Sequence, residues 1–146
     1  MKLFEQAEIQ YNTYELLCEM VELSHANKER FASRNSPIFN ATIAVGMNLG
    51  RQCGHTTAVM KYAEEHPSVT IVVGTAEQAR RIGGKAFTVD QVERQLDRMD
   101  FRCEFKSKVI LFDACSSLAV KRLSSDACEY LEKDQIPAMV HVGTVL

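Results

Sequence analysis

Residues 43–57 read Ile-Ala-Val-Gly-Met-Asn-Leu-Gly-Arg-Gln-Cys-Gly-His-Thr-Thr. An apolar run ends in a glycine-bearing loop, the loop ends in two threonines, and a helical pattern starts at Ala58. A strand, a glycine loop and a helix in this order suit an anion, because the backbone N–H groups and the dipole of the helix start both favour negative charge. A threonine hydroxyl at the helix start can bind the Mg²⁺ that accompanies a phosphate. The segment therefore predicts a phosphate-binding loop.

The loop departs from the regular pattern G-x-x-x-x-G-K-[ST] at two places. Leu49 stands at the first glycine, with Gly50 one place late, and His55 stands at the lysine. A neutral imidazole is shorter than a lysine side chain and donates only one hydrogen bond. Arg51 is a permanent cation in the same loop, and its guanidinium suits bidentate contact with phosphate.

The rest of the chain alternates short apolar runs with helical patterns. Strands are expected at about residues 39–46, 69–74, 108–113 and 138–142, and helices at about 54–65, 75–81, 88–99 and 116–133. This alternation predicts an α/β fold, a three-layer sandwich with a mostly parallel sheet of four to five strands. Ligands in such sheets bind beyond the carboxyl ends of the strands. The glycine loop, Asp113 and Thr144 are expected to share that edge.

The N-terminal part is expected to be helical. Tyr14, Leu17 and Val21 fall at helical spacing in one long amphipathic helix over about residues 13–34, and residues 3–11 are expected to form a separate turn or short helix. Pro37 ends the helix, so residues 1–36 form an N-terminal helical segment and residues 37–146 the α/β core of a single domain. The apolar stripe of the helix covers the core or, if exposed, forms a homo-oligomer interface.

Composition excludes several classes of protein. The 146 residues, 46% hydrophobic and 25% charged, fit one globular domain, and the net charge of −2 gives no global nucleic-acid signature. No apolar run approaches the roughly 20 residues of a membrane span. No secretory signal is visible at the start, so a cytoplasmic protein without a membrane partner is expected. The five cysteines are odd in number and lack a C-x-x-C, which argues against a disulfide framework or a zinc site.

Asp113 follows four apolar residues at the end of an expected strand. In a phosphate-binding α/β fold such an acid holds Mg²⁺ directly or through water. With both elements in place, the chain resembles the P-loop NTPases, and most of all the ATPase core of superfamily 2 helicases and viral large terminase subunits. The segment Gly50-Arg-Gln-Cys-Gly-His-Thr-Thr57 is similar to their irregular Walker A loop, S/G-R-Q-x-G-K-T-T, at every place except the lysine. The resemblance covers about residues 39–146.

The resemblance implies roles for particular residues. The phosphate-binding residues would be Gly50, Arg51, Gln52, Cys53, Gly54, His55, Thr56 and Thr57. Thr56 and Asp113 would bind the metal, and Asp113 and Thr144 would be the catalytic residues, Thr144 from a segment similar to the coupling motif after the fourth strand. Residues 74–79 resemble the motif that contacts nucleic acid or couples movement. The last strand is expected to insert between the first strand and the strand of Asp113.

These residues predict a protein that binds ATP and Mg²⁺ with weak or absent hydrolysis, and the resemblance extends to association with DNA. Ala114 stands where the families carry the glutamate that activates water, and a missing general base typically costs about 10²–10⁴ in rate. The alternative is a catalytically dead P-loop-fold domain that regulates a protein partner, and the same resemblance implies a viral or mobile-element regulator. Two further interpretations of the loop stay open. The glycines could form a simple tight turn, or a dinucleotide site, although their spacing is G-x-x-x-G-x-x-x-G rather than G-x-G-x-x-G.

Overall fold

The computed structural model describes residues 2–30, 43–47, 54–84, 86–97, 107–131 and 133–143. These residues form five α-helices, five strands and one 3-10 turn. In chain order they are α1 (Lys2–Arg30), β1 (Ala44–Met47), α3 (His55–Glu65), β2 (Val69–Val73), α4 (Ala76–Ile82), β3 (Ala86–Thr88), α5 (Val89–Asp97), β4 (Val109–Asp113), α6 (Ser117–Tyr130), η1 (Lys133–Gln135) and β5 (Ala138–Val142). The predicted α/β alternation is confirmed.

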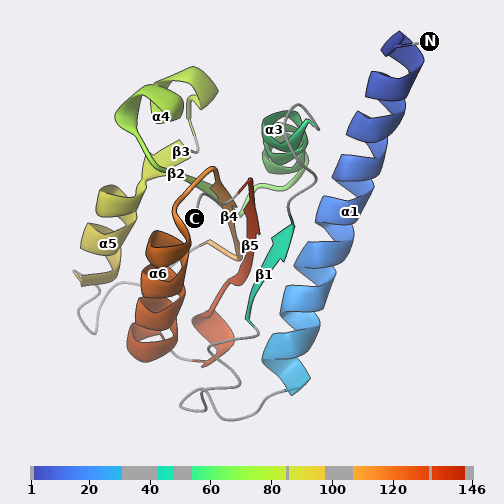
Figure 1. Cartoon of the computed structure of the whole chain (residues 1–146). Coiled ribbons are helices and arrows are strands. Elements are labelled where there is room, and N and C mark those ends of the chain that lie inside the picture. Colours follow the sequence, from blue (N-terminus) through green and yellow to red (C-terminus); the bar gives the residue numbers. More distant parts are fainter. Residues whose placement is uncertain are drawn as a thin grey trace.

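The five strands form one sheet in the order β1-β5-β4-β2-β3, and every pair in it is parallel. Helices α1 and α3 cover one face of the sheet, and α5 and α6 cover the other (Figure 1). The expectation of three layers around a mostly parallel sheet of four to five strands is therefore confirmed. Strand β5 lies between β1 and β4, which is the position expected for the last strand.

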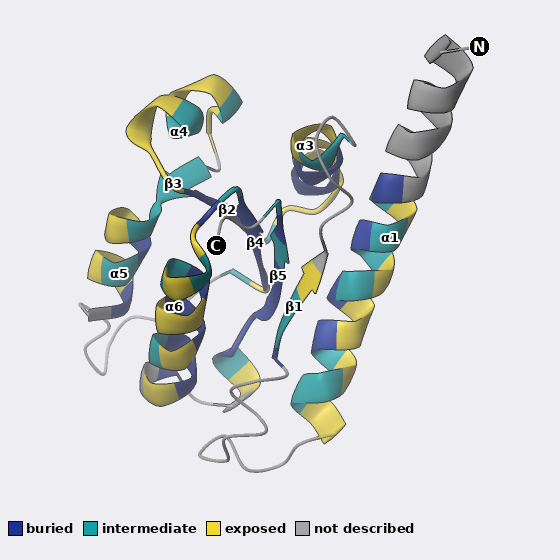
Figure 2. Cartoon of the chain, viewed as in Figure 1, coloured by how far each residue is buried: buried dark blue, intermediate teal, exposed yellow. Residues whose placement is uncertain are grey.

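Two hydrophobic clusters, one on each face, fill the space between the layers. All five residues of β2 and of β4 are buried, because both faces of these strands are covered (Figure 2). Successive side chains alternate between the clusters, so that Leu111 packs toward α1 and α3 while Ile110 and Phe112 pack toward α5 and α6. This double covering explains why the strands are apolar throughout rather than alternating in polarity.

Hydroxyl side chains start three of the helices, as the sequence predicts. The Thr75 hydroxyl accepts a hydrogen bond from the backbone N–H of Gln78 at 3.2 Å at the start of α4. At the start of α5, Thr88 and Gln91 exchange hydrogen bonds in a capping box, at 3.3 and 2.8 Å. Ser116, rather than Ser117, caps α6 through the N–H of Ala119 at 3.1 Å. Local polar signals therefore located these helix ends correctly.

Three expectations about element boundaries were wrong. Helix α1 is continuous from Lys2 to Arg30, so residues 3–11 do not form a separate turn or helix. Strand β3 was not predicted, because three residues are too few to display a period-two pattern. Helix α6 ends at Tyr130, three residues early, and η1 follows it. The boundary expected near Pro37 lies outside the described residues.

Helix α1 is joined to the sheet by apolar and polar contacts. Leu17 and Val21 are buried in the same cluster as α3 and the facing sides of β2, β4 and β5. The Ser24 hydroxyl, fully buried, donates to the carbonyl of Ile43 at 2.5 Å and accepts from the N–H of Met139 at 2.9 Å. Leu17 and Val21 of the apolar stripe therefore cover the core, as expected.

A second set of contacts ties α1 to α3. The hydroxyl of Tyr14 donates a hydrogen bond to the carboxylate of Glu65. This hydrogen bond, and to a smaller extent burial, raises the pKa of Tyr14 above its ordinary value. The ammonium group of Lys61 lies 4.1 Å from the centre of the Tyr14 ring.

Within the described ranges, no helix is long and apolar enough to cross a membrane.

Candidate functional site

The ends of four strands meet at one edge of the sheet. Asp113, the last residue of β4, pairs with Val73 of β2 on one side and with Val142 of β5 on the other, and Val142 pairs with Met47 of β1. The carboxyl ends of β1, β2, β4 and β5, with Asp113 among them, therefore lie at the same edge. In open α/β sheets this is the edge at which ligands bind.

Gly54 begins helix α3 at this edge. Its backbone is left-handed, with φ 75° and ψ 27°, a conformation that other residues adopt at a cost of about 1–2 kcal/mol. Glycine has no side chain with which to cap the helix, and the first turn of α3 carries no acidic residue. The positive end of the helix dipole is therefore not neutralised by a carboxylate of its own first turn, which is the arrangement that favours an external anion.

Thr56, in the first turn of α3, contacts Asp113 across the sheet edge. Its hydroxyl Oγ1 donates a hydrogen bond to the carboxylate Oδ2 of Asp113 at 2.8 Å, although the two residues are 57 positions apart in the chain. A hydroxyl that donates its proton to a carboxylate keeps its oxygen lone pairs as acceptors. The pair therefore places two oxygen atoms that can bind a cation at one point, next to the start of α3.

Asp113 is buried in spite of its charge, with only 6% of its surface exposed. Burial raises the pKa of this carboxyl above its ordinary value of 3.8, while the Thr56 hydrogen bond and the nearby His55 imidazole act in the opposite direction. Burying a carboxylate costs free energy unless its charge is compensated. The fold therefore holds a destabilising group at the edge where a ligand would bind.

His55 occupies the position between the glycine and the threonine. Its Nδ1 lies 3.4 Å from the point that a Cβ on Gly143 would take, so the imidazole packs against the backbone at the end of β5. It is also close enough to Asp113 to favour the ionised carboxylate. The side chain that replaces the expected lysine therefore belongs to the same cluster as Thr56, Asp113 and Gly143.

The oxygen pair fits a hard divalent cation. Mg²⁺ is usually bound through one or two carboxylates, with phosphate oxygens and water completing an octahedron. Among the residues that the structure describes, no group of three or more His, Cys, Asp or Glu side chains could hold a metal by itself. Asp113 and Thr56 could supply two oxygen ligands to such a cation.

The remaining predicted site residues divide into two groups. Thr57 is exposed on α3, one position beyond the residue that contacts Asp113. Gly50, Arg51, Gln52, Cys53 and Thr144 lie outside the described residues. The structure therefore brings together Gly54, His55, Thr56 and Asp113, and these four are the observed part of the predicted site.

Ala114 is a feature of this edge that the sequence did not predict. Its φ of 55° makes it the one residue other than glycine with a positive φ in the described part of the chain. Its N–H donates to the carbonyl of Val142 at 3.0 Å, which ties the end of β4 to the end of β5. The identity of Ala114 gives no signal for this conformation, since alanine has the highest intrinsic propensity for the right-handed helix. Backbone strain of this kind is concentrated at functional sites.

Replacing Ala114 with glycine is expected to stabilise the protein by about 0.5–1 kcal/mol, because the relief of about 1–2 kcal/mol of left-handed strain exceeds the entropy that glycine loses on folding. Urea unfolding monitored by circular dichroism measures the change. The matched control is Ala26→Gly at an exposed position within α1, which should destabilise by about 1 kcal/mol. Equal losses in both variants would show that Ala114 is not strained.

Comparison with protein-family models, with curated proteins and with solved structures finds no match to this chain. A functional assignment therefore depends on the geometry of the sheet edge described above.

Proposed function

We propose that this protein binds a nucleoside triphosphate, ATP by its resemblance to the ATPase cores, together with Mg²⁺ at the edge formed by α3, β4 and β5. The observation that carries the proposal is the hydrogen bond between Thr56 and Asp113. It joins the hydroxyl at the start of the helix after the glycine loop to the acid at the end of a buried strand. These are the two side chains that hold the metal in P-loop enzymes.

The topology supports the same proposal. The helix that carries Thr56 follows β1, and β5 separates β1 from β4, the order that the helicase and terminase resemblance implies. A nucleotide bound at this edge would place its phosphates at the uncapped start of α3. The glycine at the helix start leaves room for the phosphates to approach the backbone.

The same geometry argues for slow hydrolysis or none. Position 114 carries no carboxylate to activate water, and its methyl group cannot accept a proton. His55 lies against Gly143 rather than on a long, mobile stem, so it offers less charge to a transferring phosphoryl group than lysine would. We therefore infer a binding protein whose bound nucleotide is retained rather than rapidly turned over.

Isothermal titration with a non-hydrolysable ATP analogue tests the proposal, with and without Mg²⁺. Saturable binding that requires Mg²⁺ and is lost in Thr56→Val, a variant that keeps the shape of the side chain but removes its hydroxyl, is the expected result. Thr57→Val is the control, because Thr57 is exposed and has the same helical environment. No binding at millimolar nucleotide would reject the proposal and favour the alternative of a protein-binding regulator.

Restoring the lysine is expected to strengthen nucleotide binding. In His55→Lys, an ammonium group can reach the phosphates, and a hydrogen bond to a charged group contributes about 1.5–3 kcal/mol, or roughly tenfold or more in affinity. The same titration measures the change. Thr57→Lys adds an equal charge two residues further along the helix. An equal gain in affinity in that variant would show non-specific electrostatic attraction rather than a specific contact of Lys at position 55 with the phosphates.

A further inference from the structure

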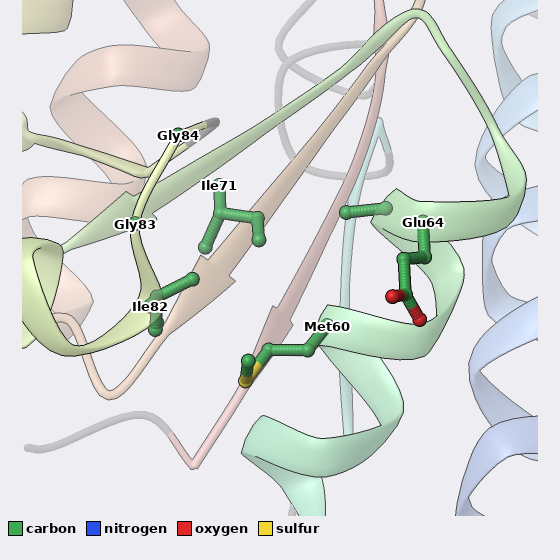
Figure 3. Close-up of a pocket in the computed structure, with 7 residues that line it drawn as sticks. Met60, Glu64, Ile71, Ile82, Gly83 and Gly84 are labelled. Carbon is green, nitrogen blue, oxygen red and sulfur yellow. The ribbon is translucent and has the colours of Figure 1, made fainter.

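A pocket of about 430 Å³ lies on the α3 face of the sheet, away from the edge that holds Asp113. Residues from three elements line it. They are Met60, Ala63 and Glu64 of α3, Ile71 of β2, and Ile82, Gly83 and Gly84 at the end of α4. Figure 3 shows Met60 and Ile82 extending toward each other from opposite sides, with Ile71 of the sheet between them. The volume falls within the range of about 300–1,000 Å³ found for sites that enclose small molecules.

The walls of the pocket are apolar, and the parts formed by Met60 and by Gly83 and Gly84 are exposed to solvent. Ile71 and Ala63 form a buried floor, while Met60 is 41% exposed, which is high for a large apolar side chain. Around Gly83 and Gly84, no atom of the described residues, apart from each glycine's own chain neighbours, lies within 4 Å of the place where a Cβ would stand. Methionine is flexible and adapts its shape to a ligand. The pocket can therefore accept a flexible hydrocarbon chain without moving the backbone.

Among the described residues that line the pocket, Glu64 is the ionisable one, and it lies on the exposed surface of α3. No residue that the structure describes forms an ion pair with it at contact distance. The nearest lysine on the same helix, Lys61, lies over the ring of Tyr14 on the α1 side. A carboxylate beside an apolar cavity attracts a cation that also carries an apolar chain.

We propose that this pocket binds a small aliphatic amine, with its hydrocarbon chain against Met60, Ile71 and Ile82 and its ammonium group against the carboxylate of Glu64. The chemistry excludes anions, which Glu64 repels, and it disfavours neutral alcohols, which form no charge-assisted hydrogen bond. Met60 and Glu64 stand four and eight residues after Thr56 on α3, about 6 and 12 Å further along the helix axis. The amine site is therefore separate from the proposed nucleotide site, although both use the same helix.

Methyl resonances of Met60, Ile71 and Ile82 in NMR spectra report directly on the pocket during titration with hexylamine at neutral pH. We expect saturable shifts confined to these methyl groups, with weaker binding of hexanol and none of hexanoate. Glu64→Gln preserves the shape of the side chain and should weaken hexylamine binding about two- to fivefold, the loss expected when an exposed charge contact is removed. Glu19→Gln, on the exposed surface of α1, is the matched control and should have no effect.

A second variant blocks the pocket. Gly84 has no positive φ and open space around it, so Gly84→Leu is tolerated by the backbone and should abolish the methyl shifts. Hexanol binding as tightly as hexylamine, or Glu64→Gln without effect, would overturn the proposal. The titration is repeated in Asp113→Ala without nucleotide. Amine binding is expected to persist there, so the two proposals can fail independently.

Discussion

Substituting asparagine for Asp113 is expected to weaken Mg²⁺-nucleotide binding and to stabilise the protein at the same time. Asparagine keeps an oxygen that can accept the Thr56 hydrogen bond, but it carries no charge for the metal. Truncating one member of a buried charged contact costs about 2 kcal/mol or more, so affinity should fall at least about 30-fold. Isothermal titration of the variant measures this loss.

The expected stabilisation depends on pH in a defined direction. Burial raises the pKa of Asp113 in the folded state, so the folded protein binds this proton more tightly than the unfolded chain does. The resulting stabilisation is complete below the ordinary carboxyl pKa of 3.8 and is lost as the pH rises through the higher folded-state pKa. At neutral pH the ionised carboxylate therefore destabilises the fold, and removing it should raise the free energy of unfolding.

Urea unfolding of both proteins at neutral pH and at pH 4 tests this sign. The advantage of Asp113→Asn should be largest at neutral pH and should shrink on acidification. Asp90→Asn is the control, because Asp90 is an exposed carboxylate in the first turn of α5. Removing it should destabilise slightly through the helix dipole, by about 0.3–1 kcal/mol. A loss of stability in Asp113→Asn at neutral pH would show that the carboxylate has a structural role, which would count against a site kept for ligand binding.

Replacing Ser24 with alanine is expected to lower the free energy of unfolding by about 2–4 kcal/mol. The serine is fully buried, and its hydroxyl is a partner of both the Ile43 carbonyl and the Met139 N–H. Without it, two buried backbone groups lose a hydrogen bond, at about 1–3 kcal/mol each. Such a loss is a large fraction of the total stability of a domain of this size. Chemical unfolding measures the change, and hydrogen exchange at the Met139 amide locates it.

Ser125→Ala is the matched control for this prediction. Ser125 is exposed on α6, and substitutions at such positions usually change stability by less than about 0.5 kcal/mol. A loss of the same small size in Ser24→Ala would mean that the Ile43 carbonyl and the Met139 N–H bond to each other directly. In the parallel register that pairs Ala44 with Met139, these two groups face each other. The Ser24 hydroxyl therefore joins α1 to the first residue pair of the ladder between these strands.

Short-range patterns predicted most of the secondary structure. Each apolar run of five residues became a buried parallel strand, and Thr75, Thr88 and Ser116 began helices where hydroxyl caps were expected. The failures occurred where the local signal was weak. Strand β3 has only three residues. No glycine or proline separates residues 3–11 from the residues that follow, and α1 is continuous through them.

The candidate site was predictable only in part. Thr56 and Asp113 were selected from the sequence as metal ligands because each stands at an expected boundary between a strand and a helix or loop. In the structure their side chains form a hydrogen bond. The contact of His55 with Gly143 and the left-handed backbone of Ala114 had no sequence signal, because both depend on how β5 is placed beside β4.

The order of strands and helices along this chain follows from local chemistry. Apolar five-residue runs favour buried strands, hydroxyl side chains start helices, and glycines end them, and each of these effects acts over a few residues. The strand order is not local in this sense. The hydrogen bond of Thr56 to Asp113 and those of Ser24 to Ile43 and Met139 likewise join residues 57, 19 and 115 positions apart. Contacts of this range form only when the sheet and its covering helices assemble, since it is the packing of two faces that brings the strand ends to one edge.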